Sequence, residues 1–526
     1  MRRQVTWLAA CLLVAACSSG AKPDAGARPG STPDSSVQAP PADSAAPGQP
    51  DASMSEPATT LTAAQLRDPA TCAGCHPAHY REWSSSMHAY AAKDPVFLAM
   101  NRRGQRETNG ELGDFCINCH APMAVRDNLT KDGLNIEQLP DFERGVSCYF
   151  CHNVTAIEGD HNGKLRIAND STMRGPLRDP FPSAAHGSEY SSLLDEEKPT
   201  STAMCGGCHD VVTPAGVRLE RSFKEYKHGI FGKSPPGSTL PFDSCSGCHM
   251  PPKPGFAADV AGAPQRTLHE HMWPGVDVPL TDFPHSEAMR SAVEDCELGR
   301  AVPFFNLEVT PPDLFTFQIE TGAGHNQPSG SAQDRRMWLE FLAYDESGKL
   351  IESVSSGNIA DGELEEKPVG DPKHDPNLFM MRDRIFDAEG KQVHMFWDAR
   401  KSAAYPEGHE SSALPVALTT YVEGQNAVVK QYRALGPDGK LPARVTARLR
   451  MRPIGLDTLQ DLVASGDLDP AFVAKMPTFT FGAQIEWTTA DGLLKTIPPK
   501  QTSDCGSYRC MMDPKSPDCV MTSATK

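Results

Sequence analysis

CAGCH at residues 72–76 is the first of five pentads in which two residues separate a pair of cysteines and a histidine follows the second cysteine. The other four are CINCH at 116–120, CYFCH at 148–152, CGGCH at 205–209 and CSGCH at 245–249. A shuffled chain of the same composition would hold roughly 0.02 such pentads, so five of them are not a coincidence.

This spacing suits the covalent attachment of haem. Two thiols one helical turn apart can each add to a vinyl group on the same porphyrin edge, and the next residue is then held where its imidazole binds the iron. A zinc or disulfide interpretation leaves the histidine unexplained. The sequence therefore predicts five covalent haem c groups. The predicted thioether residues are Cys72, Cys75, Cys116, Cys119, Cys148, Cys151, Cys205, Cys208, Cys245 and Cys248, and the predicted proximal iron ligands are His76, His120, His152, His209 and His249.

The segment between the first and last pentads is rich in Gly, Pro and Ser and has few strong helical or strand periods. Such a segment cannot build an ordinary apolar core around five large cofactors. We therefore expect the porphyrins themselves to form its interior, with short helices and loops carrying the ligands. Neighbouring rings would then lie close together.

Further motifs carry a family resemblance. They are WSSSMHA at 83–89, GVS at 145–147, MRGP at 173–176, CHMP at 248–251 and HMWPGVD at 271–277. With them, the chain from about residue 70 to about residue 455 resembles the multihaem cytochrome c family that includes the tetrahaem electron carriers of nitrifying bacteria. The resemblance implies bis-histidine irons, which are closed to substrate and have low potentials.

The resemblance also implies the second iron ligands. His88, His186 and His271 match the family's distal positions, and His228 matches the general placement between the fourth and fifth pentads. His325, in GAGHNQPSG at 322–330, corresponds to a loop histidine that a following β domain offers to one haem. The chain departs from the family pattern after that histidine, and a plain glycine-rich turn is the alternative. His79, His161 and His269 are further candidates, methionine ligation is a minority possibility, and His285, His374, His394 and His409 are expected to be structural or at the surface.

The pattern of apolar and polar residues changes near residue 300. Apolar and polar residues alternate over 304–320, 336–344 and 443–452, and turn sequences separate these runs. Short alternating strands between turns predict an antiparallel β-sandwich. The fold class is therefore α+β. The expected organisation is a pentahaem domain of short helices and loops at 61–298, a β-sandwich-like domain at 299–500 and a cysteine-containing tail at 501–526.

The N-terminus is typical of an exported lipoprotein. Two arginines precede an apolar run over residues 5–16 that is too short to span a bilayer, which indicates a signal peptide at 1–16. The run ends in VAAC, which resembles a lipobox, so Cys17 is the predicted lipidation site. Residues 17–60 form an Ala/Pro/Ser-rich tether. The protein is expected at the outer membrane, on its periplasmic or cell-surface face, with membrane contact only through the lipid. Cys296, Cys505, Cys510 and Cys519 form an even set that suggests two disulfides.

A formal net charge of −17 argues against nucleic-acid binding. The leading functional hypothesis is electron transfer with redox partner proteins, either other cytochromes or quinol-linked complexes. The rival is an oxidoreductase that reduces hydroxylamine or a small nitrogen or sulfur oxyanion at one open haem. The regular form of all five pentads counts against the rival. A third hypothesis makes the β domain a docking module for a partner.

Overall fold

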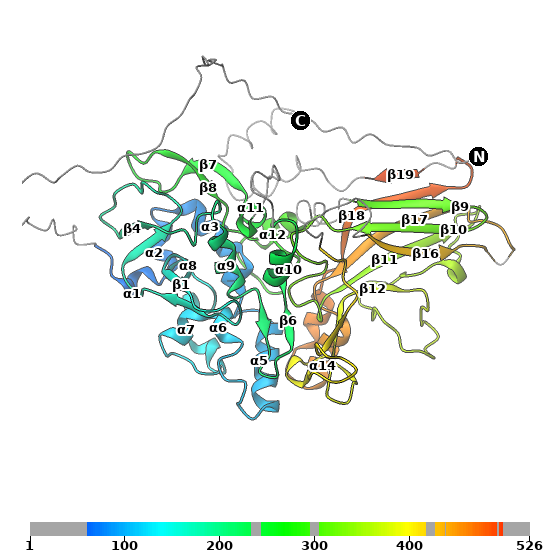
Figure 1. Cartoon of the computed structure of the whole chain (residues 1–526), viewed down its shortest axis with the longest axis horizontal. Coiled ribbons are helices and arrows are strands. Elements are labelled where there is room, and N and C mark those ends of the chain that lie inside the picture. Colours follow the sequence, from blue (N-terminus) through cyan, green and yellow to red (C-terminus); the bar gives the residue numbers. More distant parts are fainter. Residues whose placement is uncertain are drawn as a thin grey trace, which may run out of the picture. The chain divides into compact units, whose positions relative to one another are not determined.

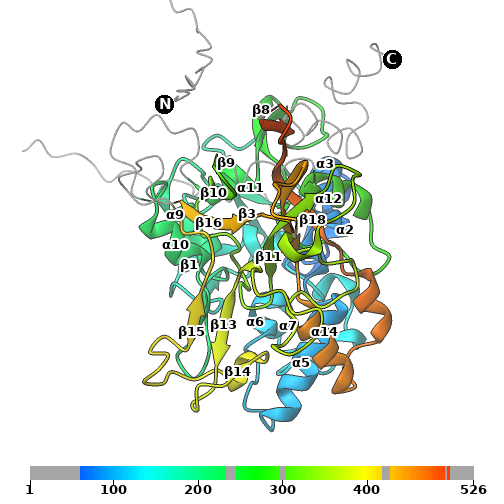
Figure 2. The same cartoon turned by 90° about the vertical axis from the view of Figure 1, so that its right-hand side faces the viewer.

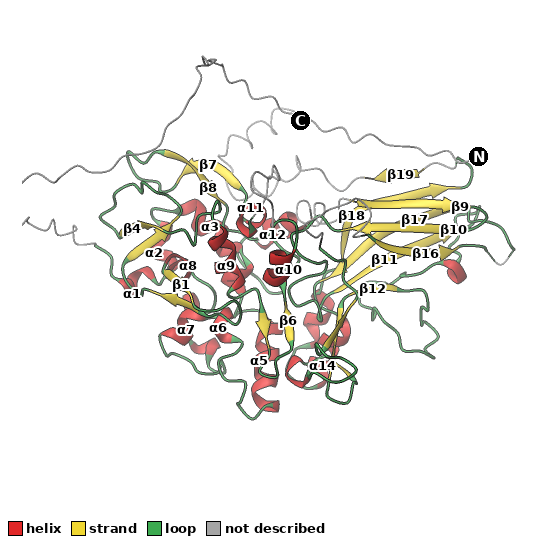
Figure 3. Ribbon diagram, in the orientation of Figure 1, coloured by secondary structure: helices red, strands yellow, loops and turns green. Residues whose placement is uncertain are grey.

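The computed structural model describes residues 60–232, 244–294, 304–416, 427–436, 438–491 and 494–497. Helices and short strand pairs occupy the first part of the chain, and longer strands dominate after residue 304 (Figure 1; Figure 3). The α+β prediction is confirmed. The signal peptide, Cys17, most of the tether, Cys296 and the C-terminal tail lie outside the described residues.

The pentad-bearing part consists mostly of helices of one or two turns. Among the helices that the structure describes there, α5 alone is longer than ten residues. Proline at the first helical position and side-chain caps begin several of them, as where Asp94 accepts a hydrogen bond from the amide of Val96 in α5. The helices are α1 (Ala63–Leu66), α2 (Pro69–Ala73), α3 (Pro77–Ser85), α4 (Met87–Tyr90), α5 (Pro95–Glu107), α6 (Ile117–His120), α7 (Pro122–Arg126), α8 (Cys148–His152), α9 (Pro199–Gly206), α10 (Ser222–His228), α11 (Cys245–His249) and α12 (Ser286–Ala292).

Four two-stranded pairs connect these helices. The β3–β4 pair is parallel and the other three are antiparallel. They are β1 (Val154–Ile157) with β2 (Leu165–Ile167), β3 (Thr172–Gly175) with β4 (Gly187–Tyr190), β5 (Val211–Val212) with β6 (Arg218–Glu220), and β7 (Pro252–Phe256) with β8 (Gln265–His269). Two of the pairs supply a group that faces the histidine of the preceding pentad, since β3 provides the carbonyl of Arg174 for His152 and β6 provides the carboxylate of Glu220 for His209.

The second half contains two antiparallel sheets with a common core. One has the order β16-β10-β9 and the other β12-β11-β17-β18-β19. Phe315 and Phe317 of the first sheet and Phe341 of the second are fully buried in the same apolar cluster. The strands are β9 (Phe304–Thr310), β10 (Leu314–Glu320), β11 (Arg336–Tyr344), β12 (Phe379–Met381), β16 (Val428–Arg433), β17 (Arg444–Arg452), β18 (Phe479–Thr488) and β19 (Leu494–Ile497). The three alternating runs of the sequence are thus strands of the two sheets.

The sequence analysis missed two features of this half. One is a small sheet of β13 (Asp383–Phe386), β14 (Gln392–Val393) and β15 (His409–Ser411). The other is α14 (Leu456–Ala464), which buries Leu459 and Leu462 in one apolar cluster with Val96 and Ala99 of α5. Figure 2 shows α14 beside α5. This helix therefore joins the β half of the chain to the pentad-bearing half.

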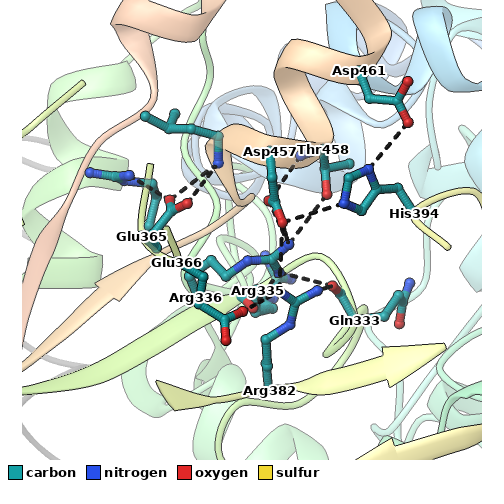
Figure 4. Close-up of polar contacts among 12 residues, drawn as sticks. Gln333, Arg335, Arg336, Glu365, Glu366, Arg382, His394, Asp457, Thr458 and Asp461 are labelled. Atoms are coloured by element: carbon teal, nitrogen blue, oxygen red, sulfur yellow. Dashed lines mark hydrogen bonds and ion pairs between the residues drawn. The ribbon is translucent and has the colours of Figure 1, made fainter. Parts of the chain in front are cut away.

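A network of charged residues anchors α14 (Figure 4). Arg336 of β11 donates two hydrogen bonds, of 2.6 and 2.8 Å, to the carboxylate of Asp457 in the first turn of α14. Arg382 lies 3.6 Å from the same carboxylate, and His394 contacts it at 3.5 Å and Asp461 at 3.2 Å. Burial alone raises the pKa of Asp457, but the hydrogen bonds from His394 and Arg336 hold it far below its usual value.

None of the helices in the described part of the chain is both long enough and apolar enough to cross a membrane.

Candidate functional site

The five pentads are called sites 1 to 5 in chain order. The pentads of sites 2, 3 and 5 coincide with the short helices α6, α8 and α11, and those of sites 1 and 4 begin in α2 and α9. Because an α-helix has 3.6 residues per turn, cysteines three positions apart lie on one face of such a helix. All ten pentad cysteines have free thiols. This is the arrangement that thioether attachment requires.

Thiols of different pentads lie in contact. Cys72 of site 1 is hydrogen-bonded to Cys148 of site 3, and Cys119 of site 2 to Cys208 of site 4. Cys205 of site 4 has the same contact with Cys245 of site 5. The attachment edges of neighbouring sites are therefore adjacent, with site 4 touching both site 2 and site 5.

Four pentad histidines each have a second histidine ring at nearly the same separation. The ring centres are 6.2 Å apart for His76 and His186, 6.2 Å for His88 and His209, 6.3 Å for His152 and His271, and 6.4 Å for His249 and His325. The ring planes are within 29° of parallel in three pairs and inclined by 66° in the pair of site 4.

This separation fits a metal ion between the rings. An imidazole nitrogen binds a metal at about 2 Å, so two rings on opposite sides of one ion have centres about 6 Å apart. Direct ring stacking would bring the centres closer, as for Phe97 and His120 at 4.2 Å. The residues present therefore fit a haem iron with two histidine ligands at sites 1, 3, 4 and 5.

Hydrogen bonds orient most of these imidazoles through Nδ1. Of the five proximal histidines and the four distal candidates paired with them, seven have a backbone carbonyl facing Nδ1. This leaves Nε2 as the ligating atom. The carbonyls belong to Ala257 for His76, Ala91 for His120, Arg174 for His152, Pro274 for His249, Gly187 for His186, His269 for His271 and Asn326 for His325. Local structure supplies them, since Arg174 lies in β3 and Ala257 directly follows β7.

His209 differs from the other proximal histidines, because its Nδ1 lies 3.1 Å from the Glu220 carboxylate. Burial by itself lowers the pKa of His209, but the hydrogen bond and charge of Glu220 outweigh it and raise the pKa to about 9. Burial lowers the pKa of the distal candidates His88 and His325 to about 3 and about 4.

Site 2 lacks a histidine pair in the described residues. Phe97 of α5 stacks on its proximal His120. His228, the remaining distal candidate, is exposed at the end of α10 and makes no ring contact with another histidine in the part of the chain that the structure describes. The assignment of His228 as an iron ligand thus stays a prediction.

The other histidines are mostly engaged elsewhere. His269 has Nδ1 on the carbonyl of Met250 and Nε2 3.4 Å from Glu196. His394 faces two carboxylates, and Nδ1 of His161 faces Asp160. His79 lies edge-on to His271 with ring centres 4.8 Å apart, and edge-on to His76 with ring centres 6.3 Å apart, so it stays a second distal candidate for site 1 beside His186.

Comparisons with known proteins agree with this geometry. Residues 71–153 match the family described as cytochrome c554 and c-prime. Among solved structures, the chain is similar to the penta-heme cytochrome c552 from Thermochromatium tepidum, with 20% identity and a TM-score of 0.50 over 83% of this chain and 100% of that one. None of the curated proteins matches. The family model supports the resemblance to multihaem c-type cytochromes, and the structural match shows a similar fold.

Proposed function

We propose that this protein is a pentahaem c-type cytochrome that transfers electrons between redox partner proteins. The observation that carries the proposal is the set of four histidine pairs with ring centres 6.2 to 6.4 Å apart, each containing the histidine of a pentad. Haem c, when bound, supplies an iron that alternates between two oxidation states.

The ten pentad cysteines would hold the porphyrins and the five pentad histidines would be proximal ligands. The distal ligands would be His186 at site 1, His271 at site 3, His88 at site 4 and His325 at site 5. Two imidazoles per iron leave no open position, which favours electron transfer over chemistry at these four sites.

Contacts between the sites support a relay. The thiol contacts join site 1 to site 3 and join site 4 to sites 2 and 5. Burial is the largest cause of the raised pKa of Cys151 at site 3, and the charges of Cys208 and Cys205 at site 4 raise it further. All five attachment edges thus form one connected set, as stepwise electron movement requires.

Site 2 supports a second candidate function. Its proximal His120 has no second histidine ring beside it among the described residues, so an iron there would keep an open position if His228 is not its ligand. A small nitrogen or sulfur oxyanion, or hydroxylamine, could bind and be reduced at such an iron. The other four sites would then supply electrons to it.

The expected setting is that of an exported lipoprotein held at the outer membrane through Cys17. Other cytochromes or quinol-linked complexes would be its partners. The acidic surface implied by a net charge of −17 suits a partner with a basic docking face.

The test uses protein matured in a host that attaches haem c. Red protein heavier than the processed polypeptide by five haem groups is expected, and colourless protein of bare polypeptide mass would contradict the proposal. Electron paramagnetic resonance of the oxidised protein then separates the two functions. Five low-spin signals, one of them lost in His228→Ala, indicate a pure carrier. One high-spin signal that shifts with nitrite or hydroxylamine indicates an enzyme.

A further inference from the structure

Site 4 differs from the other four sites in the group that faces Nδ1 of its proximal histidine. Ala257, Ala91, Arg174 and Pro274 offer neutral carbonyls to the proximal histidines of sites 1, 2, 3 and 5. The carboxylate of Glu220, by contrast, faces His209 at 3.1 Å.

The local fold fixes this contact. The hairpin of β5 and β6 begins two residues after His209, and its register pairs Val211 with Glu220. A turn at Gly216, where φ is 81°, returns the chain, and the amide of Thr213 donates to the carbonyl of Val217. A non-glycine residue at Gly216 would be strained. The carboxylate is therefore held against the ring by the backbone that follows the pentad.

The carboxylate is largely shielded from solvent. Its side chain is 17% exposed, and His209 is the one ion-pair partner that the described residues give it. The charge of Glu220 also acts on Arg335, whose guanidinium is bound at 2.7 and 2.8 Å by both carboxylate oxygens of Asp277.

We propose that Glu220 is a positioning residue that gives the iron of site 4 the lowest reduction potential of the five. A carboxylate that accepts the Nδ1 proton increases the basicity of the imidazole and so strengthens its bond to ferric iron. The negative charge also favours the more positive oxidation state of the metal. Neutral carbonyls strengthen the imidazole–iron bond and favour the ferric state more weakly, so the irons of sites 1, 3 and 5 should be reduced first.

This inference rests on the proposed function and adds an order of reduction to it. Site 4 contacts sites 2 and 5 through its thiols and lies beside site 3. A low potential at site 4 would place an energy barrier between the sites on its two sides. Electrons would collect on either side of site 4 and cross it only when the driving force is sufficient.

The experiment is a spectroscopic redox titration of the haem-loaded full chain and of Glu220→Gln. The lowest of the reduction steps is expected to move to higher potential while the others stay in place. The low-spin resonance that changes in Glu220→Gln should be the one lost in His88→Ala, which identifies site 4. Glu220→Asp keeps the charge but retracts it from the ring, and should give a smaller shift in the same direction.

Asp461→Asn is the matched control, because Asp461 also faces an imidazole Nδ1, that of His394, at 3.2 Å. It should leave all steps unchanged. An unmoved lowest step in both Glu220 variants, or a shift in a different step, overturns the inference. Failure of the proposed function would instead appear in the unsubstituted protein as missing haem.

Discussion

His269 and His271 are two positions apart but have different surroundings. His269 uses both ring nitrogens in contacts with Met250 and Glu196, while His271 uses only Nδ1 among the described residues and pairs with His152. We expect His271→Ala to convert one low-spin signal to high-spin, because the iron of site 3 loses a ligand. His269→Ala should leave the resonance spectrum unchanged. Equal effects of both substitutions would contradict the assignment of His271.

The sequence indicates the ligands better than it indicates their supporting groups. Four of the five distal candidates have rings beside pentad histidines, namely His88, His186, His271 and His325. They could be singled out because short motifs around them can be recognised. Glu220 could not be singled out, since its contact depends on how the β5–β6 hairpin returns to the pentad. Likewise, the stacking of Phe97 on His120 joins α5 to α6 and has no signature in either segment.

Among the secondary-structure elements, α14 offers a test of pH dependence. Asp457 and Asp461 raise the pKa of His394, with the Asp457 hydrogen bond the largest cause. The unfolded chain has a histidine pKa of about 6.5. Because the pKa of His394 is higher in the folded state, its stabilisation of the fold is complete below the unfolded pKa. This stabilisation is lost as the pH rises through the folded pKa. The stability difference between the natural protein and His394→Gln should therefore shrink from pH 6 to pH 9.

Denaturant unfolding at several pH values measures this difference. Arg433→Gln serves as the control, because Arg433 forms an ion pair with Asp313 that contains no histidine. A constant difference for His394→Gln would show that its carboxylate contacts do not stabilise the fold.

Strands were easier to predict than α14, for a physical reason. The alternating run at 443–452 becomes β17 almost residue for residue, because alternate side chains of that strand are buried. The run at 336–344 becomes β11, although both faces of this strand are largely buried. In α14 the buried Leu456, Leu459 and Leu462 follow a helical period over only nine residues. That is too short to stand out from a loop, and the helix is held by packing on α5 and by Asp457.

For the whole molecule, Arg335 and Asp277 tie the two halves together. The two terminal guanidinium nitrogens of Arg335, Nη1 and Nη2, donate to the carboxylate of Asp277, whose side chain is 37% exposed. Removing one partner of a buried pair costs about 3 kcal/mol, and solvent screening at Asp277 reduces this to about 1 to 2 kcal/mol. Asp277→Asn should lower the unfolding midpoint equally by haem absorbance and by far-ultraviolet circular dichroism. A shift in one probe alone would mean that the halves unfold independently.

The position of His325 between β10 and β11 has a consequence for biogenesis. A chain made from its N-terminus presents the fifth pentad well before this loop exists, and the loop takes up its place only when strands on both sides of it have paired. If His325 is the second ligand of site 5, as proposed, covalent attachment at the fifth pentad can precede the arrival of this imidazole. Maturation of that centre is then a two-stage event, and its second stage waits for the sandwich to fold.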